Sequence, residues 1–263
     1  MRKIFDIHCH IYPEKIAQKA SHAIGDFYGI KMCFEGDFES LKKQVERAGT
    51  TLAAVHSAAT LPKQVTAINE FISRSVKSDP ERFIGFGTLH PLSEKIEQEV
   101  EDIISLGLKG IKIHPDFQKF DLDSPAAMKM FEIVGDRLPF LIHIGDKRYT
   151  YSAPSKLKVV MKQFPKVRVI GAHLGGWTVW DEAVKELADT ENLFVDCSSS
   201  LYFLSPKRAA EIIHIYTPER VFYGTDYPMW DLSEELERFD ALPLSDGDKQ
   251  KILWDNAQEY FGL

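Results

Sequence analysis

The sequence has few cysteines and no long apolar run, and each absence narrows the class of protein. Its three cysteines, Cys9, Cys33 and Cys197, lie far apart and form no CxxC pair. A disulfide framework is therefore not expected, and a reducing compartment is favoured. No stretch approaches the roughly 20 apolar residues of a membrane span, and the first residues lack the apolar segment of a secretion signal. We therefore expect a cytoplasmic protein that makes no membrane contact.

The sequence also lacks a strong excess of charge of either sign. The formal net charge is −7 over 263 residues, and Lys and Arg are spread along the chain. Nucleic-acid binding needs a clustered basic surface, so no nucleic-acid partner is expected. Hydrophobic residues make up 44% and charged residues 27%, which is typical of a globular protein with a large core. The expected partner is a small-molecule substrate, and exposed aromatic residues would also suit a homodimer.

Short apolar runs alternate with amphipathic segments along the chain. Eight runs are rich in Ile, Val, Leu and Phe, as expected of parallel strands covered on both faces. They lie at residues 3–8, 51–57, 82–89, 109–114, 139–144, 167–173, 192–197 and 220–226. Eight β/α units at a barrel's usual length of about 250 residues predict one (β/α)8 TIM barrel over residues 1–263.

Helical periodicity fills most gaps between these runs. One apolar stripe predicts a helix between the third and fourth strands, and its members are Ile96, Val100, Ile103 and Ile104. The exception is residues 11–36, which we interpret as an extended loop after the first strand. Loops of this length are usually functional or carry small elements of their own, so we expect a partial cover over the barrel mouth.

Histidines gather at the C-terminal ends of the predicted strands, where barrel enzymes build their active sites. Asp226 ends the eighth strand. Buried imidazoles and carboxylates are costly unless they are paired or bound to metal, so this clustering predicts a functional site. Seven of the nine histidines lie at or just past a strand end: His8, His10, His56, His90, His114, His143 and His173.

The first strand carries two histidines separated by one residue. Side chains alternate along a strand, so His8 and His10 face one side while Cys9 faces the other. Two neutral imidazoles on one face can chelate a cation. An HxH pair alone is a weak signal, but further donors stand at other strand ends. We predict one metal ion per chain, with zinc favoured over Mn²⁺ or Fe²⁺, held by His8, His10, His143 and Asp226.

Two residues are candidates for acid–base chemistry. Water on such an ion becomes a nucleophile near neutral pH, and Asp226 could both ligate the ion and take a proton from that water. His173 lies in a glycine-rich run, 171–176, which leaves room for a ligand above the strand. It suits orienting the water, polarising a carbonyl or general acid–base work. The alternatives are a helix N-cap for Asp226 and a structural, backbone-bonded His173.

Seven motifs follow one another from the first predicted strand to the C-terminal helix. They are FDIHCH, GIKIHP, LIHIGD, VIGAHLGGW, FVDCSSS, FYGTDYPM and ILWDNAQEYF. Together they resemble the amidohydrolase superfamily, in the amidohydrolase-related branch that includes aminocarboxymuconate-semialdehyde decarboxylase-like enzymes. The resemblance implies a barrel with one divalent metal, usually zinc. By position it implies catalysis by His173 and metal ligation by His8, His10, His143 and Asp226.

The residues expected to contact the substrate are less settled. Some superfamily members carry a carbamylated lysine on strand four that bridges two metals, and Lys112 lies on the predicted fourth strand; the alternatives are a substrate-carboxylate contact and an internal ion pair. His114 is expected to line the site on the same face. Arg148 could grip a substrate carboxylate bidentately or be a solvated loop charge. Trp177 could form an apolar substrate wall or cap the core.

Three functions fit these features. The first choice is a metal-dependent hydrolase that acts on an amide, lactone or ester of a small carboxylate-bearing substrate, because hydrolysis is frequent in the superfamily. The alternative is metal-dependent, non-oxidative decarboxylation of an aromatic or unsaturated carboxylic acid, with the same metal and His173. A non-catalytic metal-binding barrel is disfavoured, because every ligand and catalytic position is filled.

Overall fold

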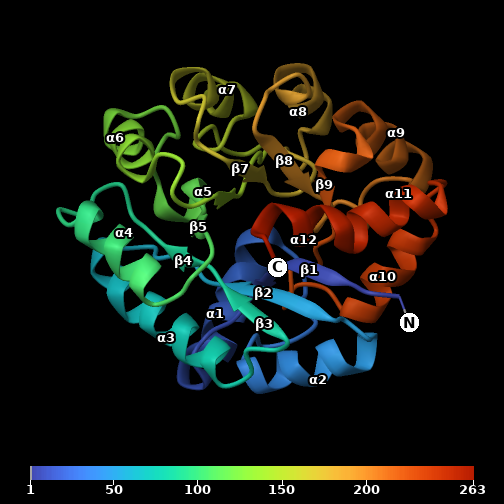
Figure 1. Cartoon of the computed structure of the whole chain (residues 1–263), viewed down its shortest axis with the longest axis horizontal. Helices are drawn as coiled ribbons and strands as arrows, with labels where there is room; N and C mark the ends of the chain where they lie inside the picture. The colour runs from blue at the N-terminus through green and yellow to red at the C-terminus, as the bar shows by residue number, and fades with distance from the viewer. Residues whose placement is uncertain (1) are drawn as a thin grey trace.

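A computed structural model describes residues 2–263, and in it a ring of helices surrounds short parallel strands (Figure 1). Each predicted run contains a strand, although most are shorter than expected. The first sheet consists of β1 (Phe5–His10), β2 (Leu52–His56) and β3 (Phe83–Gly85). The second consists, in order, of β4 (Gly87–Thr88), β5 (Ile111–Ile113), β6 (Phe140–Ile142), β7 (Val169–Gly171), β8 (Leu193–Asp196) and β9 (Val221–Phe222).

Backbone hydrogen bonds link the two sheets at both of their junctions. The run predicted at 82–89 divides at Phe86, whose N–H still bonds to β2 while the N–H of Gly87 bonds to Gly110 before β5. At the other junction, Asp226 N–H donates to His8 O at 2.8 Å, and Ile7 N–H donates to Tyr223 O at 3.0 Å. These bonds place the first strand beside the last, as the barrel arrangement requires.

Helices pack around the outside of the strands (Figure 1). In α4, Ile96, Val100 and Ile103 are buried as predicted, but Ile104 is exposed. The longer outer helices are α2 (Phe38–Ala48), α3 (Val65–Lys77), α4 (Ile96–Ser105), α6 (Pro125–Val134), α7 (Pro154–Gln163), α8 (Trp180–Leu187), α9 (Pro206–Tyr216) and α10 (Leu232–Asp240). The shorter helices are α5 (Pro115–Gln118), α11 (Asp246–Gln250) and α12 (Asn256–Phe261).

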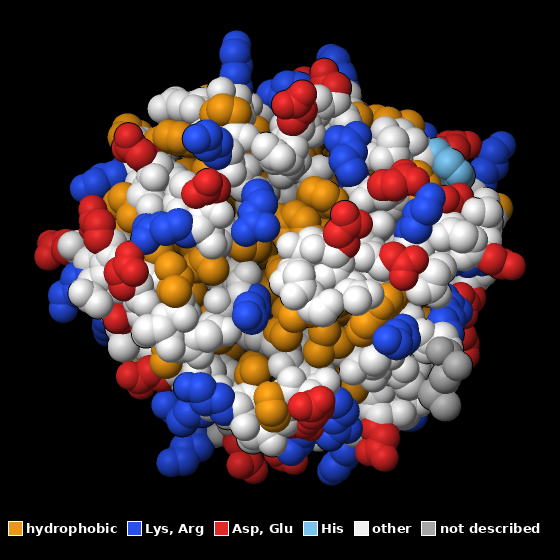
Figure 2. Space-filling model, in the orientation of Figure 1, with side chains coloured by type: hydrophobic (Ala, Val, Ile, Leu, Met, Phe, Trp, Pro, Cys, Tyr) orange, Lys and Arg blue, Asp and Glu red, His pale blue; other side chains and the backbone are white. Residues whose placement is uncertain are grey.

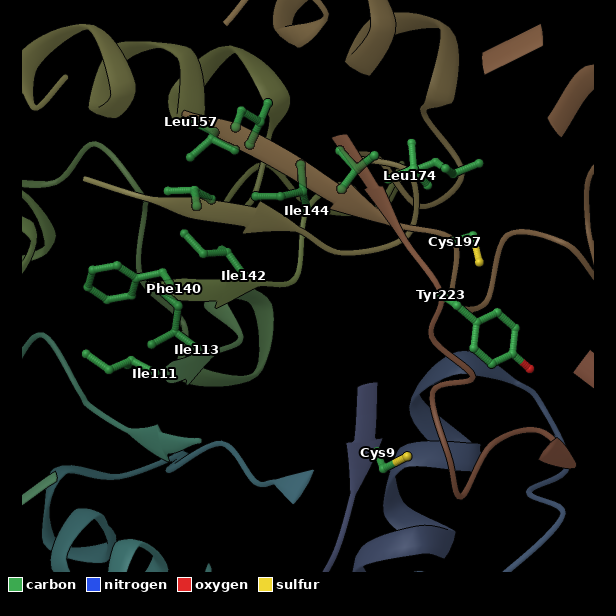
Figure 3. Packing of buried hydrophobic residues seen from close by; sticks show 14 of the residues in the cluster. Cys9, Ile111, Ile113, Phe140, Ile142, Ile144, Leu157, Leu174, Cys197 and Tyr223 are labelled. Carbon is green, nitrogen blue, oxygen red and sulfur yellow. The ribbon is translucent and has the colours of Figure 1, made fainter. Parts of the chain in front are cut away.

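The hydrophobic core has two parts. The larger part lies between strands and outer helices, where Ile142 of β6 and Leu157 of α7 belong to one buried cluster (Figure 3). The smaller part fills the barrel interior and includes Phe5 and Phe86, and both rings pack against Phe261 of α12. Figure 1 shows α12 crossing the centre of the strand array. The N-terminal end of the barrel is thereby closed with apolar side chains, so the polar strand ends lie at the other end.

Residues 11–36 differ from the extended loop that the sequence predicts. A 15-residue helix, α1 (Glu14–Tyr28), occupies most of the segment and ends at Gly29, which has a φ of 66°. Its apolar residues recur at helical spacing, as in Ile16, Ala20 and Ile24. An internal Gly25 and a start at Pro13 without a side-chain cap weaken the helical signal. The cover over the barrel mouth is therefore largely helical.

The surface carries charges of both signs. On the face that carries α12, Lys and Arg side chains alternate with Asp and Glu, and apolar patches lie between them (Figure 2). Within residues 2–263, none of the helices combines the length and the apolar character needed to cross a membrane.

Asp6 links β1 to the segment after β9 through hydrogen bonds, and these bonds are expected to contribute to stability. Its buried carboxylate accepts bonds from His8 N–H at 3.0 Å, Thr225 N–H at 3.1 Å and Thr225 Oγ1 at 2.6 Å. We expect Asp6→Ala to lower the free energy of unfolding by about 3 kcal/mol, because it leaves buried donors unpaired. Asp6→Asn, which keeps the acceptor oxygen, should lose less. A loss below about 1 kcal/mol for Asp6→Ala in chemical denaturation would contradict this role.

Candidate active site

Three of the predicted ligand atoms form a nearly equilateral triangle at the C-terminal end of the barrel. His8 Nε2 lies 3.3 Å from His10 Nε2 and 3.3 Å from Asp226 Oδ1. His10 Nε2 lies 3.4 Å from the same oxygen. Adjacent ligands of a tetrahedral ion with bonds of about 2.0–2.1 Å stand roughly 3.3–3.4 Å apart. The triangle therefore has the dimensions of one face of a metal site.

Each of three histidines has one ring nitrogen engaged by a fixed oxygen. His8 Nδ1 is 2.8 Å from Asp196 Oδ2, which orients the imidazole as carboxylates commonly orient metal-ligating histidines. His143 Nε2 is 2.8 Å from the carbonyl oxygen of Gly145. His173 Nδ1 is 3.0 Å from the carbonyl oxygen of Ser198. A carbonyl oxygen only accepts, so these nitrogens of His143 and His173 carry the proton and their other nitrogens offer lone pairs.

The free nitrogens of His143 and His173 face each other. His143 Nδ1 and His173 Nε2 are 3.0 Å apart. With both outer nitrogens protonated, this contact brings two lone pairs together unless a proton or a cation lies beside them. Ligand atoms of His8, His173 and Asp226 also lie within 4.8 Å of one another. The donor set thus continues from the triangle toward His173, and His143 is next to it.

Electrostatics keep the imidazoles neutral and the carboxylate charged. Burial lowers the pKa of His10 and of His173 to about 4, and it also holds the pKa of His143 well below its usual range. Burial alone would raise the pKa of Asp226, but His8, His10 and His173 keep it well below the ordinary value. Neutral imidazoles and an ionised carboxylate are the forms that bind a divalent cation.

The backbone at Asp226 adopts an unusual conformation that aims its side chain. Its φ of 62° lies in the left-handed region, which is costly for a residue with a Cβ and is concentrated at functional sites. Asp226 Oδ2 accepts a bond from Ser199 Oγ at 2.6 Å, and Ser199 in turn accepts from the indole N–H of Trp230 at 2.8 Å. One carboxylate oxygen is therefore fixed by Ser199 while the other faces the two histidines.

Lys112 is completely buried beside the triangle. Its Nζ is 3.0 Å from His8 Nε2, and burial lowers its pKa to about 8 although Asp226 and Asp196 oppose the shift. His114, two residues further on, stacks on His143 with ring centroids 3.9 Å apart. His114, Asp116 and His143 form a second group of potential donors, whose ligand atoms lie within 4.8 Å of one another. Positive charge and neutral imidazoles are thus both present within the pocket.

A pocket of about 440 Å³, counted together with the solvent at its mouth, opens over these groups. Its polar floor meets aromatic walls, and α1 contributes part of the cover. Tyr28 of α1 packs edge to face on Trp177, with centroids 4.8 Å apart, and its hydroxyl is 2.9 Å from His114 Nε2. The lining residues are His10, Tyr12, Ile24, Tyr28, Met32, Lys112, His114, Phe117, His143, His173, Trp177, Ser199, Asp226, Pro228 and Met229.

Arg148 is not among the residues that line this pocket, although its guanidinium lies 5.5 Å from the ring centroid of Tyr28 and 5.9 Å from that of Trp177, which do. Its guanidinium pairs with Asp146, with Nη2 2.7 Å from Oδ2, and also donates to the carbonyl oxygen of Phe27 at the end of α1. It stacks over Phe27 at 4.6 Å from the ring centroid. In this arrangement Arg148 fastens the cover helix to the loop after β6.

The structure brings most predicted site residues together and adds others that the sequence reasoning missed. His8, His10, His143, His173, Lys112, His114, Trp177 and Asp226 surround or line the pocket, whereas Arg148 does not. The missed residues include Asp196, Ser198 and Ser199, which orient the site, and Tyr28, which covers it. A signal was available for the first three, because the motif FVDCSSS ends a predicted strand at the same edge.

Comparison with known proteins identifies the family of this chain. Residues 5–263 match the sequence profile of a family described as Amidohydrolase. The chain is 25% identical over 243 residues to 2-amino-3-carboxymuconate-6-semialdehyde decarboxylase of Dictyostelium discoideum. That alignment covers 74% of this chain and 66% of the relative, just under two thirds of its length.

Solved structures share the fold over nearly the whole chain. An uncharacterised TIM-barrel protein from Bordetella bronchiseptica has a TM-score of 0.81 at 19% identity, covering 99% of this chain and 98% of that one. A dihydroxybenzoic acid decarboxylase from a Polaromonas species, with bound manganese and the inhibitor 2-nitroresorcinol, has a TM-score of 0.75 at 16% identity, covering 100% and 98%. From its sequence match, its fold and its donor set, the chain belongs to the amidohydrolase family of metal-dependent barrel enzymes.

Proposed function

We propose that this protein is a metal-dependent, non-oxidative decarboxylase of a small aromatic or unsaturated carboxylic acid. The observation that carries the proposal is the division of one pocket into two kinds of surface. Its floor presents the donor triangle and His173, while its walls include the aromatic rings of Tyr28, Phe117 and Trp177. A planar acid could place its ring between the aromatic walls and its carboxylate against the floor.

The donor set fits a divalent cation. His8, His10 and Asp226 would hold the ion, and His143 would add a fourth donor through Nδ1 if its ring moves slightly toward the triangle. Such an ion would bind the acid's oxygens and withdraw electron density from the substrate. The mixed nitrogen and oxygen set suits zinc or manganese, and the manganese-bound decarboxylase of similar fold supports including manganese.

In the proposed reaction a proton is added to the carbon that bears the carboxylate, and the carbon–carbon bond then breaks to release CO₂. His173 is placed to relay this proton from solvent, because its Nδ1–H is held on Ser198 O while its free Nε2 can take up a proton and donate it to the carbon. A pKa of about 4 keeps the resting His173 ring neutral near pH 7 and makes its protonated form a strong proton donor. The ionised carboxylate of Asp226, in the same donor group, would stabilise the protonated His173 ring.

Hydrolysis, the function favoured by the sequence, becomes the second candidate. The named relatives are decarboxylases, which supports the lyase alternative. One observation still favours hydrolysis: Lys112 lies beside His8 and has a lowered pKa. A neutral lysine can be carbamylated and could bridge two ions between the triangle and the pair His143 and His173.

The activity assay separates the two functions. We expect the manganese- or zinc-loaded protein to convert ring-hydroxylated benzoates, such as 2,6-dihydroxybenzoate, into CO₂ and the corresponding phenol without the carboxylate. In D₂O the product should carry one deuterium at the carbon that lost the carboxylate. If the protein turns over amides, lactones or esters but releases no CO₂ from a panel of ring-hydroxylated benzoates, the assignment changes to hydrolysis.

Metal content tests the donor triangle. We expect about one divalent ion per chain by plasma mass spectrometry, and we expect His8→Ala to lose it while the barrel stays folded. His214→Ala serves as the matched control, since His214 lies on α9 and bonds to Ala210 O. Full metal retention in His8→Ala would remove this residue from the site, and two ions per wild-type chain would favour the Lys112-bridged hydrolase.

His173→Asn tests the proton-delivering role. The variant should keep the metal and the fold but lose at least roughly 100-fold in kcat, the usual scale for general acid–base residues. KM should change much less, because the substrate carboxylate binds elsewhere on the floor. Steady-state kinetics on metal-saturated protein provide the measurement, and an unchanged kcat would leave His173 with a structural role only.

A further inference from the structure

His56, the last residue of β2, has an unexplained position. It is completely buried at the polar end of the barrel. Its ring meets the His10 ring edge to face with centroids 4.4 Å apart, and it meets the His8 ring in the same way at 5.0 Å. Neither of its ring nitrogens has a hydrogen-bond partner among residues 2–263. Buried polar groups are almost always paired, so these nitrogens call for a ligand from outside the chain.

Three other histidines at this end of the barrel are each paired with a protein group. His8 pairs with Asp196, and His143 with the carbonyl oxygen of Gly145. His90, which is also buried, accepts a bond from Leu92 N–H at its Nδ1. His56 differs from all three, and its only aromatic contact outside the histidine cluster is a stacked one with Phe86 at 6.1 Å in the described part of the chain. Simple core packing does not account for a polar ring here.

The neighbours of His56 identify the kind of ligand. Potential ligand atoms of His8, His10 and His56 all lie within 4.8 Å of one another. Opposite ligands of one ion stand about 4.2–4.4 Å apart at bond lengths of about 2.1–2.2 Å, so small side-chain rotations bring all three to a common centre. A cation at that centre would satisfy a nitrogen of His56 and would still contact Asp226 through the shared triangle.

We propose that His56 is a further ligand of the cation held by His8, His10 and Asp226. The first two strands then supply three imidazoles to one ion, because β1 and β2 pair in register with His10 opposite His56. With His143 included, the ion has five protein donors. Structural and catalytic zinc sites rarely exceed four donors from the protein, so this set favours Mn²⁺ over zinc.

The test compares His56 with His90, another buried histidine at the same end of the barrel. Metal-free wild type, His56→Leu and His90→Leu are titrated with Mn²⁺ against a competing chelator. We expect the Kd of His56→Leu for Mn²⁺ to rise at least tenfold and that of His90→Leu to match the wild type. Without metal, the Tm of His56→Leu should equal or exceed that of the wild type, because unpaired nitrogens are removed. The rise in Tm on adding Mn²⁺ should shrink in the same variant.

The result that overturns the inference is an unchanged Mn²⁺ affinity in folded His56→Leu. If that variant does not fold, His56→Gln takes its place with the same expectation of weaker binding and the same contrary result. The inference rests on the cation of the proposed function but not on its chemistry. If the protein catalyses no decarboxylation but its Mn²⁺ affinity depends on His56, the assignment of His56 as a ligand holds. If the wild type binds no divalent cation, both that assignment and the metal site are wrong.

Discussion

The orientation of the buried imidazoles depends on oxygen atoms fixed behind them. Asp196 behind His8, Gly145 behind His143 and Ser198 behind His173 each hold one ring nitrogen at 2.8–3.0 Å. The opposite nitrogens consequently face the pocket. Because burial keeps the pKa values of His143 and His173 low, these rings remain neutral and concentrate lone pairs in a small space. A cation or a proton within such a cluster would stabilise it.

The two ends of the barrel carry different kinds of side chain, and this difference places the imidazole cluster. Apolar side chains and α12 close the N-terminal end, so polar groups are confined to the C-terminal end. There the left-handed backbone at Asp226 and its bond to Ser199 aim one carboxylate oxygen at the two histidines of β1. The cover helix α1 then brings Tyr28 over the same groups. The site therefore combines residues from both ends of the chain, with β1 and α1 at one end and Ser199 and Asp226 toward the other.

Much of this arrangement can be predicted from local patterns, and the remainder depends on tertiary contacts. Apolar runs predict all eight strand regions, and period-two spacing predicts that His8 and His10 share a face, which their 3.3 Å separation shows. The division at Phe86 was not predictable, because it reflects a change of hydrogen-bonding neighbour. Helix α1 was missed because glycine and proline, present here as Gly25 and Pro13, are also common in loops. Arg148 illustrates the same limit, since its pairing with Asp146 is invisible to composition.

The proposed function depends on one cation between His8, His10 and Asp226. Anomalous diffraction from manganese-soaked crystals, recorded on both sides of the manganese absorption edge, locates that ion directly. We predict a peak about 2.0–2.3 Å from His8 Nε2, His10 Nε2 and Asp226 Oδ1. A crystal without a peak there, or with the ion confined to the group of His114, Asp116 and His143, would contradict it.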